Sequence, residues 1–307
     1  MRASISIGAF LVVFVAACGA GGPGEVEPVT EATSEKLVIF TVNYPLAHFS
    51  ERIGGDLVEV VFPAPADEDP AFWSPDAETI AAYQGADLIL LNGAGYAKWV
   101  DRATLPTSKI VDTSAAFADR LVPLAGTTTH SHGPEGEHEH GGYAFTTWLD
   151  PVLAARQARA VADSLSSLRP DKTDDIQSRL GLLEADILGL DQHLEAAAGA
   201  IGETPLLFSH PVYQYLIRRF ELNGLEVHWE PDEAPDGEAW DHLEELLESH
   251  PAKWMLWEGE PLEATVAGLN ELGVSSVVFD PCGNRPEAGD YLSVMETNAD
   301  ALEAIAQ

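Results

Sequence analysis

Apolar runs of β-strand character alternate with amphipathic helical patterns along most of this 307-residue chain. Strands that alternate with helices predict βα units, in which the strands pair in parallel and helices cover the sheet. Because four such strands occur in each half, we predict an α/β fold with two (βα)₄ lobes. The predicted strands are 37–42, 58–62, 87–91 and 109–111, then 205–209, 225–229, 254–257 and 276–279. The predicted helices between them are 46–53, 77–83, 212–220, 240–248 and 262–272.

Two further helices are predicted between the halves, within residues 150–200. The first begins at Asp150-Pro151, an N-cap residue followed by a proline, and ends before Pro170. The second, at 172–198, would be about 40 Å long. It carries one apolar stripe, formed by Ile176, Leu180, Leu183, Ile187, Leu190 and Leu194. A coiled-coil dimer is the alternative, but the repeat is short and lacks charged flanking positions, which favours a rigid helix joining the two lobes of a monomer.

The N-terminus is typical of an exported bacterial lipoprotein. Arg2 precedes an apolar run that is too short to cross a bilayer, which needs about 20 residues. The run ends in Val15-Ala16-Ala17-Cys18, which resembles a lipobox, so we predict a signal peptide at 1–17 and lipid on Cys18. Residues 18–36 are rich in Gly, Pro, Glu, Thr and Ser and would form a flexible tether. An ordinary signal peptide with an incidental cysteine is the alternative.

The charge balance and the absence of catalytic motifs narrow the function further. The chain has 50 Asp and Glu against 16 Lys and Arg, a formal charge of −34. Nucleic acids and anionic membrane surfaces require basic patches, so neither is an expected partner, whereas cations are. Gly93-Ala94-Gly95 lacks the third glycine of a dinucleotide fingerprint, since Lys98 stands there. We therefore predict neither an enzyme nor an organic cofactor.

A histidine-rich segment interrupts the α/β pattern at residues 126–142. It contains His130, His132, His138 and His140, interspersed with glutamates and almost no apolar residue. Such a composition predicts a mobile loop. Imidazoles and carboxylates together suit Zn²⁺, but without a regular ligand spacing the loop would bind ions weakly. A solvated polar loop without metal is the alternative.

Three chemically reactive side chains directly follow predicted strands of the second half. These are His210, Glu258 and Asp280. Parallel strands end at the same edge of a sheet, where open α/β folds bind ligands. The three residues therefore predict a partial site for a divalent cation. Taken singly, His210 could instead cap the next helix, and Asp280 before Pro281 could begin a turn.

Five segments follow one another in a recognisable order. They are Asp69-Pro70-Ala71, the strand at 86–93, the histidine-rich loop before Trp148-Leu149-Asp150-Pro151, Ser209-His210-Pro211 and Phe279-Asp280-Pro281. In this order they resemble the zinc- and manganese-binding lipoproteins of bacterial ABC importers, over residues 37–306. The resemblance implies two (βα)₄ lobes joined by a rigid helix, with the metal in the cleft between them. The lobes would be 37–149 and 201–307, joined by 150–200.

The chain departs from the family at two expected metal ligands. The family places histidines where Ala71 and Thr146 stand here, so the resemblance carries over only His210 and Asp280 as ligands. Three completions are open. Substitutes could fill the site, from Glu68, Asp69, Glu258 or a loop histidine. A metal chelate could bind with its own donor atoms, or another organic solute could bind against a wall formed by Trp73 and Trp148.

The resemblance implies a binding protein that captures a metal ion, Zn²⁺ first and Mn²⁺ second, for an ABC permease and its ATPase. It would be held by lipid on the periplasmic or outer face of the bacterial cell membrane. The alternatives are the same fold binding a chelate or an organic solute, and a surface adhesin or metal-buffering lipoprotein without a transporter.

Overall fold

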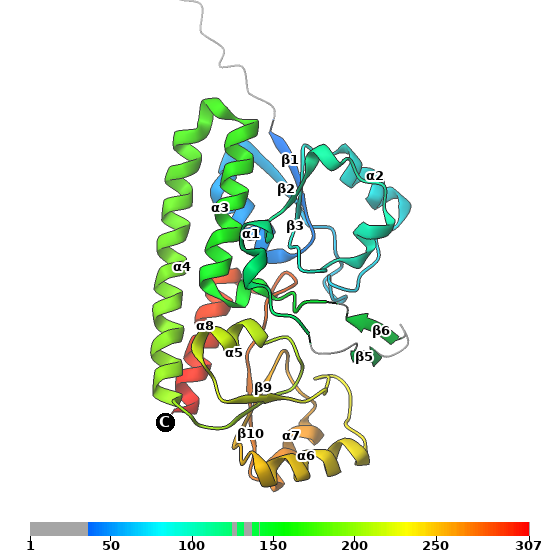
Figure 1. Cartoon of the computed structure of the whole chain (residues 1–307), viewed down its shortest axis with the longest axis vertical. Coiled ribbons are helices and arrows are strands. Elements are labelled where there is room, and N and C mark those ends of the chain that lie inside the picture. The colour runs from blue at the N-terminus through cyan, green and yellow to red at the C-terminus, as the bar shows by residue number, and fades with distance from the viewer. Residues whose placement is uncertain (1–35, 125–127, 132–136, 141, 307) are drawn as a thin grey trace, which may run out of the picture. The chain divides into compact units, whose positions relative to one another are not determined.

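The computed structural model describes residues 36–124, 128–131, 137–140 and 142–306 (Figure 1). The predicted signal peptide, Cys18 and nearly all of the predicted tether lie outside these residues. Among the helices of the described part, none has both the length and the apolar composition required to cross a membrane.

The first half forms a four-stranded parallel sheet. Its strands have the order β2-β1-β3-β4. They are β1 (Leu37–Thr41), β2 (Val58–Val61), β3 (Leu88–Leu91) and β4 (Ile110–Asp112), with α1 (Tyr44–Gly54) and α2 (Ala77–Gly85) between them. The inner strand β3 is almost entirely buried, which explains its unbroken apolar sequence Leu-Ile-Leu-Leu.

The second half repeats this arrangement. The strand order is β10-β9-β7-β8, again all parallel. Its elements are β7 (Leu206–Phe208), α5 (Gln214–Phe220), β8 (Gly224–Glu226), α6 (Gly237–Ser249), β9 (Trp254–Trp257), α7 (Glu263–Glu271) and β10 (Ser275–Val278). All eight predicted strands and the five helices between them are confirmed, with small shifts at their ends. The predicted α/β fold with two parallel sheets is therefore correct.

The helices α3 (Pro151–Leu168) and α4 (Thr173–Ile201) connect the halves. The Asp150 carboxylate caps α3 by accepting the backbone N–H of Val152 at 2.9 Å. All six residues of the predicted stripe are buried on α4. The helix α4 contacts α1 and α3, which precede it in the chain, and α5 and α8, which follow it (Figure 1). The stripe therefore serves both halves.

Short 3₁₀ helices complete the connections: η1 (Gly55–Leu57), η2 (Lys98–Arg102), η3 (Thr107–Lys109), η4 (Ala115–Arg120), η6 (Thr147–Leu149) and η7 (Pro170–Lys172). The last helix, α8 (Tyr291–Ile305), was not among the predicted elements. Asp290 and Ser293 form a capping box at its start, and Met295, Ala299 and Leu302 are buried on one face. Both the capping residues and the apolar face could have been read from the sequence. The helix α8 packs against α4.

The prediction of a loop at 126–142 was wrong for two short segments. β5 (Thr128–Ser131) and β6 (Glu137–His140) pair as an antiparallel hairpin. Backbone pairing needs no apolar side chain, and the Glu-His-Glu-His alternation has the period of a strand. The side chains of His130, His132, His138 and His140 lie outside the described part, so their metal contacts stay a prediction.

The buried stripe of α4 gives a stability prediction with a matched control. Leu183 is completely buried, whereas the adjacent Leu182 is 65% exposed. We expect Leu183→Ala to lower the free energy of unfolding by about 2 to 5 kcal/mol, since it removes packed methyl groups and leaves a cavity. Leu182→Ala should change it by about 0.5 kcal/mol or less. Urea unfolding followed by circular dichroism compares the two, and equal losses would contradict the assigned burial.

Candidate metal centre

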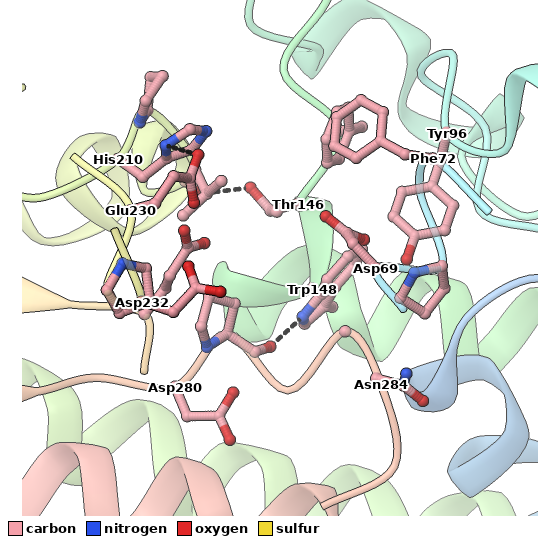
Figure 2. A pocket seen from close by; sticks show the side chains of 18 residues that line it. Asp69, Phe72, Tyr96, Thr146, Trp148, His210, Glu230, Asp232, Asp280 and Asn284 are labelled. Atoms are coloured by element: carbon pink, nitrogen blue, oxygen red, sulfur yellow. Dashed lines mark hydrogen bonds and ion pairs between the residues drawn. The ribbon is translucent and has the colours of Figure 1, made fainter. Parts of the chain in front are cut away.

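A cavity of about 370 Å³ lies at the carboxyl ends of the second sheet and is closed on its other side by residues of the first half (Figure 2). The second half contributes mainly polar and charged side chains, and the first half contributes mainly aromatic ones. The lining includes Asp69, Phe72, Tyr96, Phe145, Thr146 and Trp148 from the first half, and His210, Glu230, Asp232, Glu258, Asp280 and Asn284 from the second.

Besides Asp232, which lies further along the segment after β8, one ionisable side chain lines this cavity beyond each strand of the second sheet. In the spatial order β10-β9-β7-β8, these residues are Asp280, Glu258, His210 and Glu230. Each lies shortly beyond the end of its strand. We predicted that His210, Glu258 and Asp280 share one edge of a parallel sheet. In the structure their strands are parallel, and all three residues line the same cavity.

Glu230 lies four residues beyond the end of β8, and backbone hydrogen bonds carry the strand direction to it. The N–H of Val227 donates to Phe208 at 2.8 Å, and the N–H of Trp229 donates to Ser209 at 2.7 Å. The segment thus stays beside the end of β7 until Glu230 reaches the cavity. The sequence reasoning missed Glu230, although it directly follows the predicted strand 225–229, which is the signal that identified the other three.

His210, Glu230 and Glu258 form the tightest group in the cavity. One potential ligand atom from each lies within 4.8 Å of the others. The Nδ1 atom of His210 lies 3.2 Å from Oε1 of Glu230. His210 is only 5% exposed, and the Glu230 side chain is 19% exposed. A single cation could therefore contact all three side chains while largely shielded from water.

The electrostatics of this group favour a bound cation. Burial raises the pKa of Glu258 well above its usual range, and the nearby Glu230 and Asp69 carboxylates raise it further. Burial also raises the pKa of Asp280. Carboxylates held together away from water repel one another unless a proton or a positive ion lies between them. The cavity therefore favours a positive ligand.

Asp280 lines the cavity but is not part of this group of three. Its Oδ1 atom accepts the backbone N–H of Cys282 at 2.7 Å. Its own backbone is held by Asn298, whose side chain accepts from Asp280 N at 3.0 Å and donates to Asp280 O at 2.7 Å. In Figure 2 the Asp280 side chain points away from His210 and Glu230. Asp280 therefore begins a turn at Pro281, which was the alternative role for this residue.

Of the predicted substitute ligands from the first half, Asp69 lines the cavity and Glu68 does not. The Asp69 carboxylate accepts the N–H of Ala71 at 2.8 Å, which fixes the turn that carries it. Its charge is close enough to raise the pKa of Glu258 on the opposite side of the cavity. Asp69 is therefore the carboxylate of the first half that is placed to approach a bound ion.

The two positions that depart from the resembling family offer no metal ligand. Ala71 is 4% exposed and has no donor atom. The Thr146 hydroxyl donates a hydrogen bond to the backbone carbonyl of Val212, so it ties the two halves together (Figure 2). Among the described residues lining the cavity, His210 is the only histidine.

The first half contributes an aromatic wall. The Tyr96 ring contacts Phe145 and Trp148 edge-on, with centroids 5.2 and 5.7 Å away, and Phe72 contacts Phe145. Burial raises the pKa of Tyr96, so this side chain remains a neutral hydroxyl. The third completion, an organic solute, placed Trp73 beside Trp148 in this wall. Trp148 lines the cavity, whereas Trp73 lines a separate cavity of about 270 Å³.

Comparisons with known proteins agree with this architecture. The family model described as "ZnuA: Zinc-uptake complex component A periplasmic" matches residues 39–305. The zinc-binding lipoprotein AdcA of Streptococcus pneumoniae is 28% identical over 280 residues, which cover 87% of this chain and 55% of AdcA. The chain thus spans about half the length of that relative. The high-affinity zinc uptake system protein ZnuA of Bacillus subtilis is 25% identical and is covered over 93% of its length, with 95% of this chain.

Solved structures share the fold. Zn(II)-bound AdcA from Streptococcus pneumoniae superposes with a TM-score of 0.75 at 23% identity, covering 89% of this chain and 58% of that one. The metal-dependent lipoprotein YcdH from Bacillus subtilis also gives a TM-score of 0.75, at 21% identity, covering 88% of this chain and 98% of that one.

Proposed function

We propose a function from the premise that this chain belongs to the ZnuA family, the component A of zinc-uptake complexes: it captures Zn²⁺ in the cavity of the second sheet and delivers it to an ABC importer. No chemical step is needed for this role. The ion would be held by His210, Glu230 and Glu258, with Asp69 or a water molecule completing the coordination.

The convergence of these three ligand atoms is the observation that carries the proposal. Zn²⁺ binds imidazole nitrogen and carboxylate oxygen at about 2.0 to 2.2 Å in tetrahedral sites, so neighbouring ligand atoms lie about 3.3 to 3.6 Å apart. The 3.2 Å between His210 Nδ1 and Glu230 Oε1 is close to the short end of this spacing. The residues come from three parallel strands of one sheet, so the site is rigid on that side. Among the described residues, the cavity contributes one imidazole, in place of the several that the family resemblance implies.

The proposal includes export and a lipid anchor. The sequence Val15-Ala16-Ala17-Cys18 supports lipidation of Cys18, and the relative AdcA is described as a lipoprotein. An anchored protein stays near a membrane permease and its ATPase, which would accept the ion. Replacing Cys18 by serine should release the protein from the membrane fraction, as immunoblotting of fractionated cells would show. Retention of the variant in that fraction would contradict the lipid anchor.

Zinc binding is tested by titrating the purified full chain in competition with a chromophoric chelator. The histidine-rich segment would bind ions of its own, so the experiment uses a variant in which His130, His132, His138 and His140 are alanine. One tight site is expected to remain in the cavity of this variant, and adding His210→Ala should abolish it. If no tight site remains, the cavity is not a zinc site.

Delivery to an importer is tested in cells. A strain lacking this protein should grow poorly when zinc is chelated, and added zinc should restore growth. A surface adhesin or a metal buffer would leave the rate of zinc uptake unchanged. Uptake of radioactive zinc by the deletion strain and its complemented derivative distinguishes these outcomes.

The affinity for Zn²⁺ should decrease as the pH falls. Burial and the charges of Glu230 and Asp69 raise the pKa of Glu258, so in the ion-free protein this carboxyl binds a proton at a higher pH than usual. Zinc must displace that proton, which lowers the affinity about tenfold per pH unit for each proton released. In Glu258→Gln we expect weaker binding with a shallower pH dependence. Chelator competition between pH 5 and pH 8 measures both slopes, and identical slopes would rule out Glu258 as the competing group.

A further inference from the structure

A second group of metal-ligating side chains lies between α4 and α8, outside the cavity. His193 on α4 faces Glu296, Asp300 and Glu303 on α8. The spacings of four and three residues place the three carboxylates on one face of α8. The two helices are packed against each other, so this arrangement is fixed by the fold. The side chains remain reachable from solvent, with His193 26% and Asp300 75% exposed.

The carboxylate of Glu296 orients the imidazole of His193. Nδ1 of His193 lies 2.7 Å from Oε2 of Glu296. An ionised carboxylate only accepts hydrogen bonds, so Nδ1 carries the proton and Nε2 has a free lone pair in the neutral ring. Histidines that bind a metal through one ring nitrogen typically donate the other ring N–H to a partner such as a carboxylate.

The free nitrogen points at the other two carboxylates. Nε2 of His193 lies 3.4 Å from Oε1 of Glu303 and 3.6 Å from Oδ1 of Asp300. These separations match the spacing of about 3.3 to 3.6 Å expected between ligands of a tetrahedral Zn²⁺ ion. One ligand atom of each residue lies within 4.8 Å of the other two.

The charges around His193 do not balance. Even a protonated imidazole offers one positive charge against three carboxylates. In the described part of the chain, no lysine or arginine forms an ion pair with Glu296, Asp300 or Glu303. The hydrogen bond to Glu296 raises the pKa of His193, and the charges of Glu303 and Asp300 act in the same direction. The group thus attracts positive charge, and a divalent ion supplies more of it than a proton.

We propose that His193, Asp300 and Glu303 form a second site for a divalent cation of the zinc type, with Glu296 orienting the imidazole and water filling the open position. The site joins α4 to α8 and is independent of the ion in the cavity. It therefore does not depend on the transport role proposed above.

The test uses Co²⁺ as a spectroscopic substitute for Zn²⁺ in the full chain. The background variant carries His210→Ala together with alanine at His130, His132, His138 and His140, which removes the imidazole of the cavity and those of the histidine-rich segment. We expect this variant to bind one Co²⁺ per chain with the visible absorption of a tetrahedral complex. Adding His193→Ala should abolish that absorption, whereas adding His242→Ala, an exposed histidine on α6, should not.

Two further variants separate a metal site from an ion pair. Glu303→Gln keeps the hydrogen bond between His193 and Glu296 but removes a ligand, so the absorption should be lost or strongly weakened. Glu296→Gln should lower the affinity for Co²⁺ by roughly 10- to 100-fold, as expected for an orienting partner. A background variant that binds no Co²⁺, or absorption that survives in both His193→Ala and Glu303→Gln, would overturn the proposal. Circular dichroism spectra of all variants confirm that they are folded.

Discussion

Replacing His210 by alanine should lower the affinity for Zn²⁺ by at least about 100-fold, because even groups that only orient a ligand cost 10- to 100-fold when removed. His210 is the only histidine among the described residues that line the cavity. In this variant only carboxylates remain as charged ligands in the cavity, and carboxylate oxygens suit Mg²⁺, Ca²⁺ and Mn²⁺ better than Zn²⁺. We therefore also expect the preference for Zn²⁺ over Mn²⁺ to shrink.

The measurement is chelator competition in a background that carries alanine at His130, His132, His138, His140 and His193, so that neither the histidine-rich segment nor the site between α4 and α8 contributes imidazole. His242→Ala serves as the matched control, since it removes an exposed imidazole from α6. The structure also ranks the carboxylates. Glu230→Ala and Glu258→Ala should weaken binding more than Asp280→Ala, because Asp280 is engaged with Cys282 and points away from the group. A tight site that survives His210→Ala would show that zinc binds elsewhere.

Trp148→Ala should lower the free energy of unfolding by about 3 to 5 kcal/mol, the range for deleting a large buried aromatic side chain. Trp148 is 1% exposed and contacts both halves of the chain. Its indole N–H donates to the carbonyl of Pro281 at 2.6 Å, and Gly283 lies close to the ring. Its backbone carbonyl accepts the Tyr291 hydroxyl at 2.8 Å. Deleting the ring would also open the wall of the cavity.

Two further variants separate the contributions of the ring and of its hydrogen bond. Trp148→Phe keeps most of the aromatic volume and loses the donor to Pro281, so we expect a smaller loss of stability than for alanine. Trp73→Ala is the matched control, because Trp73 lines the separate cavity of about 270 Å³ and is only partly buried. Thermal unfolding by calorimetry compares them. If Trp73→Ala costs as much as Trp148→Ala, the burial assigned to Trp148 is not what stabilises the two halves.

Much of the fold could be predicted because its signals are local. Alternating strands and helices, the Asp150-Pro151 start of α3 and the stripe of α4 each depend on residues that are neighbours in the sequence. The hairpin of β5 and β6 was missed because its segments carry no apolar pattern. The Glu-His-Glu-His alternation has the period of a strand, but both residue types are polar, so it gives no alternation of apolar and polar residues from which a strand could be predicted.

The candidate site was only partly predictable. The rule that ligands lie beyond the ends of parallel strands identified His210, Glu258 and Asp280, and applied to strand 225–229 it would also have found Glu230. The sequence could not show that Asp280 turns toward Cys282 or that Asp69 lines the cavity while Glu68 does not. Those outcomes depend on the turns that carry Asp69 and Asp280. Hydrogen bonds to Ala71, Cys282 and Asn298 set the conformation of these turns.

By itself, the sequence determined the two parallel sheets, the connecting helices and the set of strand-end side chains, because hydrophobic periodicity and capping act over a few residues. Only the tertiary structure decided which donor atoms meet. The order β10-β9-β7-β8 places His210 between Glu258 and Glu230, and the packing of α8 on α4 brings three carboxylates to His193. Ligand distances of a few ångströms are set by contacts between residues far apart in the chain, and local patterns carry no information about them.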